Sequence, residues 1–263
     1  VVASTSGTVN ITPKALTVTA DDQSKYFGQT FTFDGDEFSA SGLVGSESIA
    51  SVTLTSTGAA ASATVAGSPY PIVPSAAVAA AGTSLSNYSI TYNNGRLTVI
   101  AQIPLTITAK SDLTKIYNGS TQSVSGFTSS GLESGDSISG ITAGASGTNA
   151  GTYTATFSGT ASSVVVKDAG NNDVTYKYAI TLNNGSLKIS PKAITITANN
   201  KNKNYGQTFT FDMTSPSSDF SVTGLVGSER IASVTLASTG AAASALPGNY
   251  DINVSAAVAG VGT

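Results

Sequence analysis

The chain repeats itself at a fixed period, and this constrains its fold more than any other feature of the sequence. The text ITPKALTVTA at residues 11–20 returns as IPLTITA at 103–109 and as ISPKAITITA at 189–198. Successive copies end 89 residues apart. A fixed period of this size is typical of a linear array of small modules. The 263 residues therefore predict three small modules rather than one large domain.

Composition excludes several classes of function. Only 10% of the residues are charged, the formal net charge is −3 and there is no basic run, so nucleic acid is excluded as a partner. The chain has no cysteine and no histidine, which excludes disulfides, thiolate chemistry, cysteine-ligated metals and a serine triad. No apolar stretch is long enough to span a bilayer, so no membrane insertion is expected in this segment. We therefore predict that the protein is not an enzyme and has no catalytic residues.

Each repeat opens with an alternating pattern that predicts a β-strand. Leu-Thr-Val-Thr, Leu-Thr-Ile-Thr and Ile-Thr-Ile-Thr alternate an apolar side chain with threonine. A period of two places alternate side chains on opposite faces of a sheet, so one face is apolar. We expect the apolar residues of these stretches in the module cores: Leu16, Val18, Leu105, Ile107, Ile194 and Ile196. No stretch has a sustained helical period, so the chain is predicted to be all-β (mainly β) with very little helix.

The first and middle repeats close with a pattern that predicts a β-hairpin. The first repeat has an alternating strand on each side of Asn94-Gly95, and the middle repeat has the same pattern around Asn184-Gly185. Asn-Gly tolerates the positive φ angles of a type I′ turn, which makes it the strongest short hairpin signal. These four residues are therefore the predicted hairpin turns.

Prolines mark the joints between the predicted modules. Pro13, Pro104 and Pro191 stand where one closing strand runs into the next opening strand, with almost no spare chain. Because proline fixes φ, we expect such short joints to be stiff. The predicted division is 1–12, a closing strand of a preceding module or a donor strand; 13–101, module 1; 102–190, module 2; and 191–263, module 3 without its closing hairpin. The modules are expected to be elongated, with an Ig-like sandwich or a β-grasp-like sheet as alternatives.

Two acidic turns are the candidate metal sites. Asp34 and Asp36 stand in an Asp-Gly-Asp-Glu sequence, and Asp168 and Asp173 flank Ala-Gly-Asn-Asn. Carboxylates on a turn suit calcium, which prefers hard oxygen ligands. The EF-hand spacing is absent, however, and Asn, Gly and Asp are also the residues that turns need. Solvated turns are the favoured interpretation and calcium is the weaker alternative; no other cofactor is predicted.

Longer motifs tie the first and third repeats together. FGQTFTFD at residues 27–34 returns as YGQTFTFD at 205–212, and both repeats contain GLVGSE, whereas the middle repeat carries KIYNGST at 115–121 and then GTNAGTYTATF. With the closing NYSITYNNGRLTV of the first repeat, these motifs resemble the MBG-type (YGX) repeats of bacterial surface adhesins. The middle repeat resembles the related YDG-type repeat. The resemblance implies strand-rich stalk modules of secreted or surface-anchored proteins and brings no catalytic residues.

The front of the chain carries a strand pattern with no module before it. Gly7, Val9 and Ile11 repeat the pattern of the closing strand that starts at Gly95, and the third repeat has no closing hairpin in the sequence. One interpretation is a fragment or repeat unit of a longer protein. The other is head-to-tail assembly, in which this assembly strand completes the open module of the next copy by donor-strand complementation. The expected partners are neighbouring copies of itself or further repeats of the same chain.

These observations predict a structural repeat region, a stalk or fibre, of a bacterial extracellular adhesin or surface filament. Its role is to space and display other parts of the protein, and its expected location is the bacterial cell surface or a secreted fibre. The alternative is an adhesive module that binds a host or matrix glycan or protein, for which the tyrosines are the candidate contacts.

Overall fold

A computed structural model gives the structure of Val2 and of residues 4–260. The chain divides into two compact units. One contains the chain up to Thr106 with Ser129–Gly140 and Ala161–Thr181, and the other contains Ile107–Thr128, Ile141–Thr160 and the chain from Leu182 onward. These units do not coincide with the sequence repeats, so the predicted module boundaries stay a prediction. The names first, middle and third repeat below refer to residues 13–101, 102–190 and 191–263.

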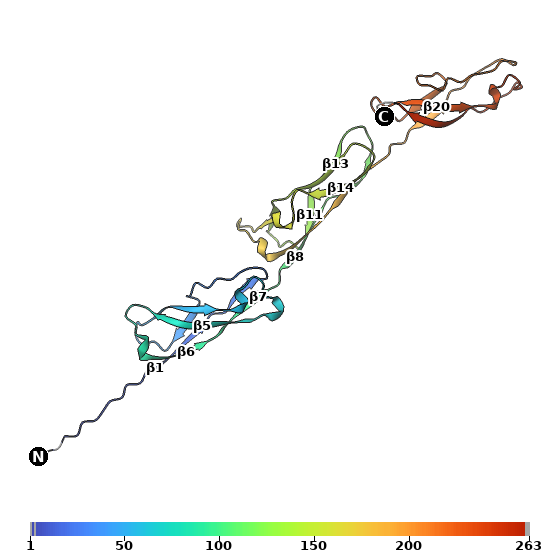
Figure 1. The fold of residues 1–263 in the computed structure, drawn as a ribbon. Helices are drawn as coiled ribbons and strands as arrows, with labels where there is room; N and C mark the ends of the chain where they lie inside the picture. Colours follow the sequence, from blue (N-terminus) through green and yellow to red (C-terminus); the bar gives the residue numbers. More distant parts are fainter. Residues whose placement is uncertain (1, 3, 261–263) are drawn as a thin grey trace. The chain divides into compact units, whose positions relative to one another are not determined.

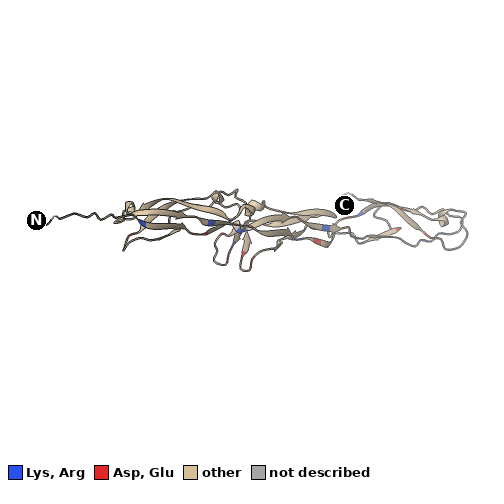
Figure 2. Cartoon of the chain, turned by 90° about the horizontal axis from the view of Figure 1, so that it is seen from below, with Lys and Arg blue, Asp and Glu red and all other residues tan. Residues whose placement is uncertain are grey.

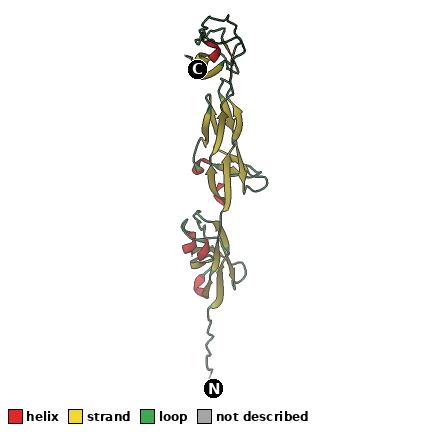
Figure 3. Ribbon diagram, turned by 90° about the vertical axis from the view of Figure 1, so that its right-hand side faces the viewer, coloured by secondary structure: helices red, strands yellow, loops and turns green. Residues whose placement is uncertain are grey.

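Strands and loops make up the described chain, and its helices are single 3-10 turns (Figure 3). These turns are η1 (Thr57–Ala59), η2 (Val65–Gly67), η3 (Leu85–Asn87), η4 (Ala161–Ser163), η5 (Thr175–Lys177) and η6 (Thr239–Ala241). No α-helix occurs among the residues that the structure describes. The predicted all-β fold with very little helix is confirmed.

The first repeat forms two sheets around one core. Its strands are β1 (Lys14–Ala20), β2 (Gln23–Tyr26), β3 (Phe38–Ser41), β4 (Ile49–Thr55), β5 (Tyr70–Ala79), β6 (Tyr88–Asn93) and β7 (Gly95–Ile100). One sheet has the order β3-β1-β6 and the other β2-β7-β5-β4. Leu16 and Val18 of the first sheet belong to the same fully buried core as Ile72 and Leu97 of the second. Two sheets that share one core make a sandwich, which was one of the two predicted alternatives.

The predicted closing hairpins are wrong, although their strands are present. β6 pairs in parallel with β1, whereas β7 lies between β2 and β5 in the other sheet. The chain therefore crosses from one sheet to the other at Asn94-Gly95, and neither residue has a positive φ. The middle repeat crosses in the same way at Asn184-Gly185. The physical reason is that each of these strands is paired and buried by partners distant in sequence, which a local turn signal does not report.

Close packing, rather than turn geometry, explains the glycines at these crossings. A Cβ added at Gly95 would lie 2.5 Å from the carbonyl oxygen of Ala20, and one added at Gly185 would lie 2.4 Å from that of Ala109. Any side chain at either position would collide with the backbone of a neighbouring strand. The Asn-Gly pattern therefore marks the place where the chain passes against that backbone.

The middle repeat has strands β8 (Ile103–Ala109), β9 (Asp112–Ile116), β10 (Gln122–Ser125), β11 (Phe127–Ser130), β12 (Ser137–Ser139), β13 (Ala143–Gly147), β14 (Gly151–Phe157), β15 (Val165–Lys167), β16 (Tyr178–Asn183) and β17 (Gly185–Ser190). The sheet orders are β10-β13-β14-β17-β9, β11-β8-β16 and β12-β15. β17 pairs in parallel with β9 and antiparallel with β14, as β7 does with β2 and β5. Leu105 and Ile107 are fully buried, so their predicted core positions are confirmed, as are those of Leu16 and Val18.

The third repeat is the simplest of the three in its described part. Its strands are β18 (Thr195–Ala198), β19 (Phe220–Thr223), β20 (Ile231–Ala237) and β21 (Asn253–Ala259), paired as β18-β19 and β20-β21. Residues 201–204, which correspond to β2 of the first repeat, form no strand. Ile194 is 43% exposed, so its predicted core position is wrong, whereas Ile196 is half-buried against the third-repeat core. The strand of the first repeat that corresponds to β18 is β1, and β1 is paired with β6.

Candidate functional site

The predicted assembly strand at the front of the chain is extended and uncovered. Residues 4–12 precede β1 and form no strand within the described chain (Figure 1). Val9 is 90% exposed and Ile11 is 88% exposed. A Cβ built on Gly7 meets nothing within 4 Å. The segment therefore presents two large apolar side chains that nothing in the described structure covers.

The corresponding residues of the other repeats are fully buried. Val9 corresponds to Leu97 of β7, which is 0% exposed, and Ile11 corresponds to Val99, which is 2% exposed. Leu187 and Ile189 of β17 are equally buried. The same Gly-x-apolar-x-apolar pattern is therefore a central core strand twice and an uncovered segment once.

β7 shows what such a strand does when it is paired. It lies in the middle of a four-stranded sheet, parallel to β2 and antiparallel to β5. Leu97 is paired with Gln23 on one side and with Tyr70 on the other. Among the described strands β7 is the only neighbour of β2, so it holds that edge strand in the sheet.

The third repeat has a groove between the residues that correspond to β2 and to the start of β5 in the first repeat. It has a volume of about 880 Å³ and lies between residues 198–211 and 238–253. Phe209 and Phe211 line it, and their rings meet edge to face with centroids 5.0 Å apart. Phe31 and Phe33 make the same contact at 5.0 Å in the first repeat. The aromatic wall of the sandwich is therefore present, and a groove lies beside it.

The first and third repeats share a lysine clamp, which is a lysine whose ammonium group bonds to the carbonyl oxygens of two loops. The sequence analysis missed it. In the first repeat Lys25 is 5% exposed, and its Nζ donates to the carbonyl oxygens of Gln29 at 2.7 Å, Ala59 at 3.3 Å and Ala60. Burial lowers the pKa of the Lys25 ammonium, because the charged form loses water. The signal was a lysine shortly before the Phe/Tyr-Gly of the first and third repeats.

The third repeat keeps the same clamp. Lys203 Nζ donates to the carbonyl oxygens of Gln207 at 2.8 Å and Ala242 at 2.7 Å. The two loops that Lys203 joins both line the groove. The groove is therefore bounded by loops held in the arrangement of the first repeat, whether or not a strand lies between them.

The acidic turn of the first repeat is closed by a residue next to the predicted calcium candidates. Asp34 and Asp36 are exposed, whereas both oxygens of Glu37 accept backbone N–H groups, from Asp34 and Gly35, each at 2.9 Å. Burial alone would raise the pKa of the Glu37 carboxyl, but these backbone donors outweigh it and lower the pKa. The carboxylate therefore stabilises the turn.

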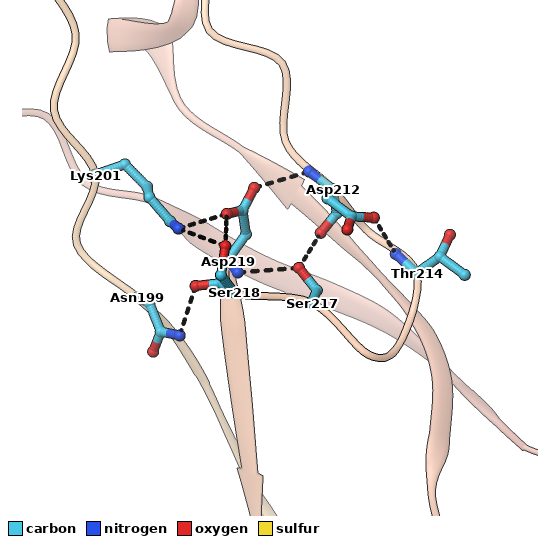
Figure 4. Close-up of polar contacts among 7 residues, drawn as sticks. All are labelled: Asn199, Lys201, Asp212, Thr214, Ser217, Ser218 and Asp219. Atoms are coloured by element: carbon cyan, nitrogen blue, oxygen red, sulfur yellow. Dashed lines mark hydrogen bonds and ion pairs between the residues drawn. The ribbon is translucent and has the colours of Figure 1, made fainter.

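Asp219 has the same role in the third repeat (Figure 4). It is 6% exposed, it forms an ion pair with Lys201 Nζ at 2.6 Å, and it accepts the backbone N–H of Asp212 at 2.8 Å. The Lys201 ammonium is the main cause of the lowered pKa of Asp219. Ser217 donates through Oγ to the Asp212 carbonyl oxygen at 2.7 Å and accepts the N–H of Asp219 at 2.9 Å, which closes the loop.

The second pair of calcium candidates also caps turns. Asp168 accepts the backbone N–H of Asn172 at 2.9 Å, and Asp173 accepts that of Thr175 at 2.9 Å. Hydrogen bonds from Asn172 lower the pKa of Asp168. Among the described residues no group of three or more acidic side chains gathers where it could hold a metal ion. The calcium hypothesis stays a prediction.

Comparison with known families decides what these repeats are. The sequence model of the MBG domain (YGX type) matches residues 16–98 and 194–260. The chain belongs to the MBG domain family. The match covers the first and third repeats, and the YDG-type resemblance of the middle repeat stays a prediction. MBG repeats occur in surface proteins, and the match fits a repeat module of a surface adhesin or a similar protein.

Other comparisons add little to the MBG assignment. Among solved structures the chain is similar to the fibronectin(III)-like modules of Clostridium thermocellum CbhA, with 11% identity and a TM-score of 0.21 over 67% of this chain and 94% of that one. A likeness of this size supports no argument about the fold. A search of curated proteins finds no match.

The predicted joint prolines lie at or near the start of each repeat. Pro13, Pro104 and Pro191 are all exposed, and Pro104 lies within β8. At the first joint Gln102 donates through Nε2 to the carbonyl oxygen of Tyr176 at 3.0 Å. The Tyr176 ring lies 5.7 Å from that of Tyr26, centroid to centroid. The stiffness of the joints stays a prediction.

A tyrosine–carboxylate pair occurs within the first and the middle repeat and was also missed in the sequence. Tyr88 donates to Glu47 in the first repeat, and Tyr178 donates to Asp136 at 2.5 Å in the middle repeat. Glu229 of the third repeat instead accepts from Tyr117 of the middle repeat. The signal was the acidic residue that ends each GLVGSE or GLESGD motif.

The charged residues of this MBG chain are scattered. Figure 2 shows mostly uncharged ribbon, with acidic and basic residues placed singly. Many of the charged groups described above are engaged in turn caps and clamps. No helix in the described part of the chain is long and apolar enough to cross a membrane.

Proposed function

We propose that this MBG-domain segment is a structural repeat region, a stalk or fibre, of a bacterial extracellular adhesin or surface filament. The observation that carries the proposal is that its charged side chains bond to its own backbone. Lys25, Glu37 and Asp219 hold loops of the sandwich, and their carboxylate and ammonium groups are occupied by backbone partners. A repeat whose charged groups maintain its own fold is suited to spacing and display.

The short joints support the same role. Two residues separate the end of β7 at Ile100 from the start of β8 at Ile103. Four residues separate the end of β17 at Ser190 from the start of β18 at Thr195. Pro191 lies in the second joint, and Pro104 is the second residue of the strand that follows the first joint. We expect joints of this length with a nearby proline to transmit orientation from repeat to repeat.

Small-angle scattering of the whole chain, with electron microscopy of the same sample, tests the stalk. We expect each repeat to add on the order of 40 Å to the length, which is two strands of about six residues placed end to end. A compact particle in both measurements would contradict the proposal.

An adhesive module that binds a glycan or a host protein is the second candidate. Tyr205 is 68% exposed, which is unusual for a large ring and suits stacking on a sugar. A glycan array with the chain and its Tyr205→Ala variant tests this role. Binding that the substitution abolishes supports adhesion, whereas no binding on the array leaves the spacer role as the better account.

A further inference from the structure

We propose that Asn118 is a site of self-modification, at which the backbone of the chain converts the side-chain amide into a carboxylate. The inference goes beyond the proposed structural function and does not depend on it. The sequence contains Asn-Gly at residues 94–95, 118–119 and 184–185. Glycine after asparagine leaves the backbone nitrogen sterically open, because glycine has no Cβ. The structure separates these three sites, and it arranges Asn118 for the reaction.

The reaction needs no reagent other than water. The backbone nitrogen of Gly119 attacks Cγ of Asn118 as its own proton is lost to solvent. The Cγ–Nδ2 bond then breaks, the nitrogen leaves as ammonia, and a five-membered succinimide ring remains. Water opens the ring at one of its two carbonyl groups, which leaves either an aspartate or an isoaspartate at position 118. The net change is the loss of one ammonia, the gain of one water and one more negative charge at neutral pH.

The Asn118 side chain is folded back over the peptide that has to attack it. Its Oδ1 accepts the backbone N–H of Ser120 at 3.0 Å, which is an Asx turn. This contact holds the amide group against the Gly119 nitrogen, which lies between the two residues in the chain. The same N–H points at the oxygen that becomes negative during the attack, so it stabilises the intermediate as an oxyanion-hole donor does.

The loop around Asn118 is open to solvent and lies outside the strand ladders. Asn118, Gly119 and Ser120 are all exposed, and they stand between the end of β9 and the start of β10. Gly119 has a φ of +76°, which glycine adopts without strain. Residues 117–121 contain no charged side chain, so the new carboxylate would be the first charge in this loop.

Asn184 is a natural control, because residues 184–186 repeat the tripeptide Asn-Gly-Ser. Here the glycine begins β17 and is paired with Ala155 of β14. The N–H of Ser186 donates to Ser111 Oγ at 3.0 Å instead of to the asparagine side chain. A peptide fixed in a ladder cannot turn to close a five-membered ring without breaking its pairing, so we expect Asn184 to be protected.

Asn94 is restrained in the same way. Gly95 is buried and is paired with Ile72 of β5. The N–H of Arg96 donates to Asp22 Oδ1 at 2.7 Å. All three asparagines are exposed, so their own exposure does not separate the sites. The difference lies in the partner of the N–H group two residues further on.

Ageing of the folded chain, followed by peptide mass spectrometry, tests the proposal. We expect conversion at Asn118 to exceed conversion at Asn184 by at least about tenfold, because the amide of Asn118 is held in place for attack. The same incubation in urea is the control, since unfolding removes the difference and the identical tripeptides should then convert at equal rates. Equal conversion at the two sites in the folded chain overturns the proposal, and so does conversion at neither.

Two matched substitutions connect the site to the charge of the whole chain. Asn118→Gln blocks the reaction, because attack on the longer side chain would have to close a six-membered ring. After ageing, folded Asn118→Gln should show far fewer acidic species in isoelectric focusing than the unmodified chain, whereas Asn184→Gln should show as many. Both asparagines are exposed, so circular dichroism and the melting temperature should not change in either variant. Acidic species that persist in Asn118→Gln contradict the proposal.

Discussion

Gly95 shows how a single residue position can be dictated by a neighbouring strand. A Cβ there would lie 2.5 Å from the Ala20 carbonyl oxygen and 2.8 Å from that of Asp21. Gly95→Ala therefore forces backbone apart inside the sandwich, and we expect it to lower the free energy of unfolding by about 1–3 kcal/mol in urea denaturation. Gly7→Ala is the control, because nothing lies within 4 Å of that position. Equal stability of Gly95→Ala and the unmodified chain would refute the packing argument.

Tyr178 is the residue whose titration should be visible in the stability of the chain. Burial and the hydrogen bond to Asp136 raise its pKa from 10.0 to about 12. Because the folded pKa is raised, the stabilisation is complete below pH 10 and is lost as the pH rises from 10 to 12. Tyr178→Phe should cost roughly 1–2 kcal/mol at neutral pH and should weaken the pH dependence in that alkaline window. Thermal melts of both proteins across the window check it, and parallel pH profiles would count against the assignment.

The alternating strands were predictable from single residues, and the chain crossings were not. Leu16, Val18 and Leu105 are buried as the period of two requires, because a strand in a sandwich always buries one face. The Asn94-Gly95 signal misled because a glycine that avoids a distant carbonyl looks the same in sequence as one that needs a positive φ.

At the scale of elements, the loop from Asp212 to Asp219 is held by one buried carboxylate. The pKa of Asp219 is lowered from 3.8, chiefly by Lys201, so its stabilisation is present above that value and is lost as the pH falls below it. Asp219→Asn should cost about 1.5–3 kcal/mol at neutral pH and should flatten the acid side of the unfolding profile. Asp251→Asn, in the same repeat, serves as the control. An unchanged acid limb in Asp219→Asn would show that the ion pair does not stabilise the loop.

The likeness of residues 7–12 to the closing strands was visible in the sequence, but these residues form no strand in the described chain. Spacing from Pro13 aligned Val9 and Ile11 with two buried strands. In the first repeat β7 pairs in parallel with β2, the segment before the Phe/Tyr-Gly motif. This pairing and the clamp made by Lys203 both depend on contacts between residues far apart in sequence. No local pattern records such contacts.

At the scale of the molecule, the stiffness that we expect of the joints can be tested at Pro191. Pro191→Gly should widen the range of lengths seen in scattering and microscopy, because glycine releases the φ angle that proline fixes. Pro13→Gly is the control, since no described strand precedes it. Each repeat should melt as before in both variants. Identical length distributions for the two would show that proline does not stiffen the joint.

The parallel pairing of β1 with β6 and of β2 with β7 has a consequence under mechanical load. Tension on the ends of the first repeat enters at Lys14 and leaves at Ile100, so the paired strands would have to slide past each other lengthwise. All the hydrogen bonds of a ladder then bear the force together instead of opening one after another. Resistance of this kind is set by the rate of unfolding rather than by equilibrium stability. Repeats of this kind would withstand a load for as long as they unfold slowly, whatever their equilibrium stability.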